Sequence, residues 1–77
     1  MNNIVSERAR KGMSQTVLAE SLGISPRTLS NWEKDSSDVP SSKACEMAEL
    51  FGCTIDYLFG RTPERTAQKV VIYSQNH

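Results

Sequence analysis

Apolar side chains recur at helical spacing along most of the chain, and residues that favour helix ends divide them into short elements. The first element is expected over residues 3–11, where Asn2 or Asn3 can act as the N-cap. Two more are expected at about residues 15–22 and 26–33, each with apolar residues gathered on one face. The pattern therefore predicts a run of short amphipathic helices in the first half of the chain.

The stretch that holds the second and third predicted helices carries several independent signals for a tight turn. Ser14 and Ser25 each stand at an N-cap position, and Pro26 takes the first helical position, where its missing N–H is no loss. Gly23 can adopt the left-handed conformation that ends a helix, and Ile24 can fill the corner with an apolar side chain. These residues predict two helices that meet at a steep angle, a helix-turn-helix arrangement.

Two further helices are predicted in the second half. The apolar residues of 42–51 follow the i, i+3, i+4, i+7 spacing without a miss, which indicates a fourth helix. Thr54 can cap a short fifth helix, and Gly60 can end it. The predicted core consists of Ile4, Ala9, Leu18, Ala19, Leu22, Ile24, Leu29, Trp32, Met47, Ala48, Phe51, Ile55, Leu58 and Phe59.

The last part of the chain, residues 61–77, differs in character from the helical domain expected over residues 1–60. Its segment KVVIYS, residues 69–74, is rich in β-branched and aromatic side chains and reads as a short strand. A lone strand cannot satisfy its backbone, so it needs a partner, either within this chain or in a second copy. A frayed tail without a partner and a sixth helix starting near residues 62–64 are the alternatives. The pairing with a second copy would place the dimer contact on Val70, Val71, Ile72 and Tyr73.

Length and composition weigh against an enzyme. A chain of 77 residues makes one domain that buries roughly 60–65% of its unfolded surface, which leaves little room to enclose a substrate. Cys45 and Cys53 lack a Cys-x-x-Cys spacing, and with His77 as the one added ligand they make a poor zinc set. We expect no catalytic residues, metal or cofactor. Because no apolar run has the length of a membrane span or a signal peptide, we expect a cytoplasmic protein with reduced thiols.

The net charge of the chain is zero, but the charges are unevenly distributed. Residues 1–34 carry five basic and three acidic side chains, residues 35–60 carry one basic and five acidic, and residues 61–77 carry three basic and one acidic. The acidic block therefore lies away in sequence from the helix-turn-helix. Attraction to an anionic partner should be local and moderate.

The run GMSQTVLAESLGISPRTLSNWEKD, followed by the fourth-helix pattern and TIDYLFG, resembles the phage repressor and Cro (XRE-like) family of helix-turn-helix regulators. The resemblance covers residues 4–60. It implies an all-α fold, a compact five-helix lambda-repressor-like domain. It also implies a regulator of transcription, typically a repressor, that binds double-stranded operator DNA as a homodimer. The extension after residue 60 lies outside the resemblance.

The resemblance places base-reading side chains at Pro26, Arg27 and Asn31. An α-helix fits the major groove, where arginine can bind guanine O6 and N7 and asparagine can bind adenine N6 and N7. Arg27 and Asn31 are four residues apart and share a helix face. Many relatives have a glutamine at the position of Pro26, and a glutamine can hydrogen-bond a base. Because proline has no hydrogen-bond donor, we expect at most an apolar contact at Pro26. Thr28 and Ser30 flank the same face and can meet a thymine methyl group or a phosphate; the plain alternative for all five is a solvated surface.

The resemblance also implies an ion pair within the fold, and the chemistry of helix N-termini suggests residues that contact phosphate. Arg8 and Glu33 match a pair that ties the first helix to the end of the third, and Trp32 is expected in the core rather than as a base-stacking residue. Phosphate contacts are expected from polar side chains and from the free N–H groups at a helix N-terminus; for the serines, ordinary capping is the alternative. The residues proposed for phosphate contact are Gln15, Lys34, Ser41, Ser42 and Lys43.

A second class of function remains open at this point. The same fold can act chiefly as a protein-interaction module, such as an antitoxin that grips a toxin through its tail. The zero net charge and the apolar segment KVVIY favour that reading. A gel shift with genomic fragments beside a pull-down separates the two, because only a DNA-binding protein retains DNA at low salt.

Overall fold

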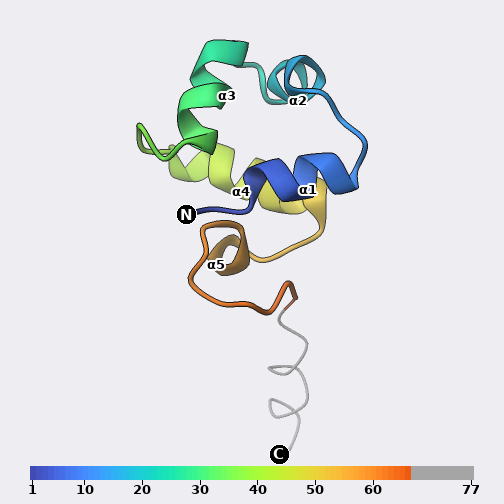
Figure 1. Ribbon diagram of the computed structural model, residues 1–77, viewed down its shortest axis with the longest axis vertical. Coiled ribbons are helices and arrows are strands. Elements are labelled where there is room, and N and C mark those ends of the chain that lie inside the picture. The colour runs from blue at the N-terminus through green and yellow to red at the C-terminus, as the bar shows by residue number, and fades with distance from the viewer. Residues whose placement is uncertain (67–77) are drawn as a thin grey trace, which may run out of the picture.

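Five helices follow one another along residues 1–66, the part of the chain that this computed structural model describes (Figure 1). No strand occurs in these residues, which confirms the predicted five-helix, all-α class. Residues 62–66 form bends rather than a sixth helix, whereas the strand expected at residues 69–74 lies outside the described residues. The helices are α1 (Ile4–Arg10), α2 (Gln15–Leu22), α3 (Pro26–Glu33), α4 (Ser41–Phe51) and α5 (Ile55–Leu58).

The helix boundaries depend on the caps that the sequence predicts. Ser14, Ser25 and Thr54 each accept a hydrogen bond from the backbone N–H three residues later, at 3.1 Å. Gly23 ends α2 with a φ of 69°, in the left-handed region of backbone conformation that residues other than glycine seldom adopt. The turn that joins α2 to α3 is therefore fixed by local chemistry.

The start of α1 involves both of the asparagines that the sequence proposes as its cap. Asn3 occupies the N-cap position, but its side chain makes no capping bond; its amide instead donates to the Tyr57 carbonyl at 2.7 Å. Asn2 accepts from the N–H of Ile4 at 3.0 Å and donates to the Trp32 carbonyl at 2.9 Å. These bonds tie the N-terminal residues to α3 and α5, contacts distant in sequence.

The core agrees with the prediction at most positions. Ala9 is an error, because it is exposed: α1 buries the face of Ile4 and Glu7, and the side that carries Val5 and Ala9 faces solvent. Ile24, Ile55 and Phe59 are only partly buried and pack against the edge of the core. The buried residues are Ile4, Glu7, Leu18, Ala19, Leu22, Leu29, Trp32, Ala44, Met47, Ala48, Phe51 and Leu58.

Glu7 is the one buried charged residue in the described part of the chain, with 2% of its surface exposed. Its two oxygens accept hydrogen bonds from Nε and one terminal nitrogen of Arg65, at 2.9 and 2.7 Å. Arg65 also donates to the Phe51 carbonyl at the end of α4, and its own carbonyl accepts from Thr54 at 3.0 Å. Residues beyond position 60 thus join α1, α4 and the start of α5.

The hydrogen bonds from the Arg65 guanidinium lower the pKa of the Glu7 carboxyl below its ordinary value, against the opposing effect of burial. An ionised Glu7 therefore stabilises the fold at pH values above its unfolded pKa of about 4.3. That contribution is lost as the pH falls through the lower pKa of the folded state.

We predict that Glu7→Gln lowers the free energy of unfolding at pH 7 by roughly 1.5–3 kcal/mol, because a charge-assisted buried bond is lost. The difference from the wild type should shrink as the pH falls below about 4.3, where the wild type loses the same contribution. Denaturant melts at several pH values measure both effects. Glu20→Gln, an exposed carboxylate on α2, is the control and should change little. Equal melts for the two variants at pH 7 would contradict the prediction.

Candidate nucleic-acid interface

The helices α2 and α3 lie together at one end of the domain, with α5 at the other end (Figure 1). They bury facing side chains, and Ala19 lets their backbones come close because it is small and 1% exposed. The N–H of Ile24 returns to the Ala19 carbonyl at 3.0 Å and closes the turn. Leu29 and Trp32 hold the inner face of α3 in the core, so its opposite face is presented to solvent.

The outer face of α3 carries polar groups without partners. Pro26 and Arg27 are exposed, and Asn31 is half-buried. Neither the Arg27 guanidinium nor the Asn31 amide makes a side-chain hydrogen bond within residues 1–66. Their donors are therefore available to a ligand, and both belong to the face that the sequence analysis selected.

Thr28 and Ser30, the other two predicted base-reading residues, are half-buried on the same helix. The Ser25 hydroxyl accepts from the Thr28 N–H at 3.1 Å and donates to the Thr28 hydroxyl oxygen at 3.0 Å. Thr28 therefore keeps its own hydroxyl proton and its methyl group for outside contacts, but its rotamer is held by the cap. Because these bonds hold the Thr28 side chain in one rotamer, any contact that it makes with a ligand is fixed in position.

The carboxylate of Glu33, the last residue of α3, joins three helices. Arg8 of α1 donates to one of its oxygens at 2.9 Å, and the Gln15 amide at the start of α2 donates to the other at 2.7 Å. The Glu33 side chain is only 6% exposed. Arg8 reaches further to the Met13 carbonyl at 3.2 Å, just before α2. The predicted pair of Arg8 and Glu33 is therefore present in the structure, and Gln15 extends it.

Gln15 and Lys34, both proposed for phosphate contact, lie near the two ends of this network. Gln15 uses one of its two amide protons on Glu33 and keeps the other. Lys34 follows α3, is exposed and makes no side-chain hydrogen bond within the described residues. Both can donate to an anion without breaking a bond of the fold.

The N-terminus of α4 lacks the side-chain cap that α2, α3 and α5 have. Ser41 and Ser42 are its first two residues and are exposed, and Pro40 at the cap position supplies no side-chain acceptor. The serines thus do not act as the cap that the alternative reading allowed. Lys43 already has partners within the domain. Its ammonium donates to the Leu22 carbonyl at the end of α2, at 2.7 Å, and lies 3.5 Å from Glu46. Lys43 supports the packing of α2 on α4.

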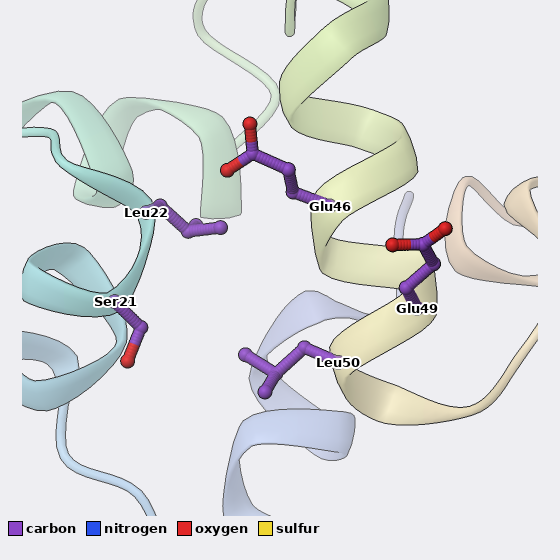
Figure 2. A pocket seen from close by; sticks show the side chains of 5 residues that line it. All are labelled: Ser21, Leu22, Glu46, Glu49 and Leu50. Carbon is purple, nitrogen blue, oxygen red and sulfur yellow. The ribbon is translucent and has the colours of Figure 1, made fainter.

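An acidic pocket lies on the side of α4 that faces the end of α2 (Figure 2). Glu46 reaches from α4 toward Leu22, and Glu49 and Leu50 follow one turn later, with Ser21 opposite. Both carboxylates are exposed, as expected for solvated charge. The two exposed carboxylates make the electrostatic potential of this pocket negative, although the Lys43 ammonium lies 3.5 Å from Glu46.

The cysteines and acidic residues form no site for a metal in the described part of the chain. Cys45 is exposed and Cys53 half-buried, and both are free thiols. Burial raises the pKa of the Cys53 thiol, helped by the charge of Glu7, which makes its thiolate scarce. Among the helices of residues 1–66, none has the length and apolar character needed to cross a bilayer.

Sequence reasoning missed one group that supports α3. The Asn2 amide donates to Oδ1 of Asp35 at 2.7 Å, and the chain's terminal amine lies 3.5 Å from the same carboxylate. Asp35 has a φ of 60°, an unusual left-handed conformation for a residue other than glycine. The chain therefore reverses immediately after α3. A cluster of asparagines near the N-terminus is the only signal for this contact in the sequence.

Two capped helices joined by a tight turn form a helix-turn-helix, the motif whose second helix enters the major groove in many DNA-binding proteins. The sequence model of the helix-turn-helix family matches residues 4–58, and the chain belongs to this family. This finding confirms the resemblance noted in the sequence and assigns the chain to DNA-binding regulators of the XRE type.

Two relatives are each similar to 70% of this chain. Repressor protein CI of Enterobacteria phage phi80 is 42% identical over 60 residues, which cover 70% of this chain and 25% of the repressor. The HTH-type transcriptional regulator ImmR of Bacillus subtilis (strain 168) is 33% identical over 54 residues, covering 70% of this chain and 42% of that protein. The chain thus spans less than half the length of either relative.

We predict that Glu33→Ala lowers the free energy of unfolding by roughly 1.5–3 kcal/mol, because the partly buried Arg8 guanidinium loses its counter-charge. Arg8→Ala combined with Glu33→Ala should cost less than the sum of the single changes, since the two residues share one interaction. Denaturant melts of the three variants give the coupling free energy. Lys34→Ala, one residue further on, is the control and should change stability by less than about 0.5 kcal/mol. If the destabilisation in the double variant equals the sum of the two single effects, the Arg8–Glu33 pair does not stabilise α3.

Proposed function

We propose that the chain is a sequence-specific regulator of transcription, acting as a repressor, that inserts α3 into the major groove of double-stranded DNA. The observation that carries the proposal is the division of α3: Leu29 and Trp32 are buried, while Arg27 and Asn31 present donors without intramolecular partners. Regulation of transcription is supported by the names of both relatives, and repression by the one named a repressor.

Base recognition is assigned to the exposed face of α3. Arg27 is the second residue of α3 and lies in its first turn, where a recognition helix meets base edges, and its fork suits guanine. Asn31 follows one turn later and suits adenine. Pro26 offers apolar contact, and Thr28 and Ser30 offer a methyl group or a hydroxyl. With two strong polar readers, part of the sequence preference should come from the shape and deformability of the DNA.

Phosphate contacts are assigned to the groups that border α3. Gln15, which bonds to Glu33, keeps a second amide proton, and Lys34, the next residue after Glu33, has an exposed ammonium. Ser41 and Ser42 bring hydroxyls and the free N–H groups of the α4 terminus. Lys43 already gives one of its three ammonium protons to the Leu22 carbonyl and lies 3.5 Å from Glu46, so its phosphate contact is the weakest member of this proposal.

Binding as a homodimer completes the proposal. One recognition helix reads only a few base pairs, and two of them one helical turn apart, about 34 Å, read a partly palindromic operator. A dimer contact through Val70, Val71, Ile72 and Tyr73 remains a prediction, since these residues lie outside the described part of the chain. The tail is also the segment through which a protein partner would bind under the alternative function.

We predict that Arg27→Ala relaxes base preference at one position per half-site and costs roughly 1–3 kcal/mol of discrimination. Lys34→Ala should weaken binding to all sequences about equally and reduce the slope of log affinity against log salt by about 1. The measurements are binding titrations at several salt concentrations, on DNA selected from a random pool and on an unrelated duplex. If Arg27→Ala leaves both affinity and preference unchanged, the assignment of α3 as the reading helix fails. Absence of DNA retention at low salt would favour the protein-interaction function instead.

A further inference from the structure

The end of α3 is closed by a residue that is unusual for its backbone conformation. The N–H of Ser36 donates to the Asn31 carbonyl at 2.8 Å, and the N–H of Asp35 donates to the Trp32 carbonyl at 3.1 Å. This pair of bonds ends many helices, and it requires a residue in the left-handed conformation, which is usually glycine. Here Asp35 takes that place, with a φ of 60°.

Glycine fills every other left-handed position in the described part of the chain. Gly12, Gly23, Gly52 and Gly60 have φ values between 68° and 79°. An aspartate in the same region carries a steric cost that glycine avoids. The exception at Asp35 therefore indicates that its side chain makes a contribution that glycine could not make.

The Asp35 side chain is held by Asn2. The Asn2 amide donates to Oδ1 of Asp35 at 2.7 Å and to the Trp32 carbonyl at 2.9 Å, and its oxygen accepts from the N–H of Ile4 at 3.0 Å. The other oxygen of Asp35 lies 3.5 Å from the terminal amine, an exposed pair that contributes little. Asn2 therefore links the start of α1 to the last turn of α3 and to the loop that follows it.

The bond between Asn2 and Asp35 lies between two groups of residues assigned to phosphate contact. Lys34 directly precedes Asp35 and comes about two helical turns after Arg27, so it belongs to the outer face of α3. The loop that starts at Asp35 leads to Ser41, the first residue of α4. A fixed Asp35 therefore fixes both the end of the helix at Lys34 and the start of the loop toward α4.

We propose that Asn2 and Asp35 are positioning residues for contact with DNA phosphates: their hydrogen bond holds the end of α3 and the following loop in the conformation that meets the DNA backbone. Groups that are ordered before binding lose less conformational freedom on binding, which strengthens a complex without any new contact. The inference rests on the proposed function and deepens it, because it names residues that orient Lys34, Ser41 and Ser42 toward the duplex.

The charge of Asp35 makes this role separable from simple electrostatics. A carboxylate beside groups that bind an anion weakens the attraction to phosphate, so on charge alone its removal should strengthen binding to every duplex. Loss of the hydrogen bond to Asn2 should have the opposite effect. A variant that loses the charge but keeps a hydrogen-bond acceptor distinguishes the two.

The experiment compares variants by binding titration on DNA selected from a random pool and on an unrelated duplex. Asp35→Asn removes the charge, tolerates the left-handed conformation and keeps an oxygen that can accept from Asn2. Asp35→Gly removes the same charge and suits the same backbone, but loses the bond. We expect Asp35→Gly to bind both duplexes roughly three- to tenfold more weakly than Asp35→Asn.

Asp38→Asn is the control for charge, because Asp38 is an exposed carboxylate of the same loop that makes no side-chain bond within the described residues. It should change binding by about as much as Asp35→Asn does. Thermal melts show that each variant is folded. Base preference should be unchanged in all three variants, because the bond acts on phosphate contacts rather than on Arg27.

Asn2→Ala tests the other partner of the bond. In the double variant with Asp35→Gly, the loss of affinity should be smaller than the two single losses combined, because both changes break one bond. Asn2→Ala also removes the bonds to Ile4 and Trp32, so it destabilises the start of α1. If it fails to fold, the comparison of Asp35→Gly with Asp35→Asn decides alone.

The outcomes separate this inference from the proposed function. Weaker binding of Asp35→Gly than of Asp35→Asn, equal on both duplexes, supports the inference. If Asp35→Gly binds as tightly as Asp35→Asn, or more tightly, the inference is overturned and the proposed function stands. A changed base preference in Asp35→Gly also overturns it, since α3 itself has then moved. If the wild type binds neither duplex at low salt, the proposed function fails and this inference fails as well.

Discussion

One carboxylate fixes how the helix-turn-helix end of the domain is assembled. Glu33 accepts from Arg8 and Gln15, so a side chain at the end of α3 sets the positions of α1 and of the start of α2. These groups are partly buried, where a hydrogen-bonded charge pair is stronger than on the surface and costly to break. The packing of Leu29 and Trp32 chooses which face of α3 is inside, and Glu33 fixes the direction in which that helix points.

Local chemistry explains why so much of the fold could be read from the sequence. Helix ends are decided within a few residues by caps such as Ser14 and Ser25 and by a left-handed Gly23, and these are legible in the sequence. The burial of Glu7 and the exposure of Ala9 could not be predicted from the sequence. Helical spacing ranks residues by polarity, so it cannot anticipate a charge buried by a partner 58 positions away.

The candidate site shows the same limit. Family resemblance placed Arg27 and Asn31 on the outer face of α3, and the structure leaves their donors without partners in the described chain. It could not reveal that the Lys43 ammonium is held by a carbonyl of α2, because that contact depends on how two helices cross. Zero net charge was likewise a poor guide. Two of the acidic side chains, Glu46 and Glu49, lie together beside the end of α2, whereas the outer face of α3 carries Arg27.

The bond between Glu7 and Arg65 bears on how this domain can be transplanted. The family match ends at residue 58, yet the counter-charge of a buried carboxylate in α1 lies seven residues later. A chimera cut at the family boundary would inherit the acid without the base and would have to protonate or expose it. The same reasoning applies over evolutionary time: positions 7 and 65 should change together, as an acid with an arginine or as two apolar residues. The unit of inheritance is therefore longer than the motif by which the domain is recognised.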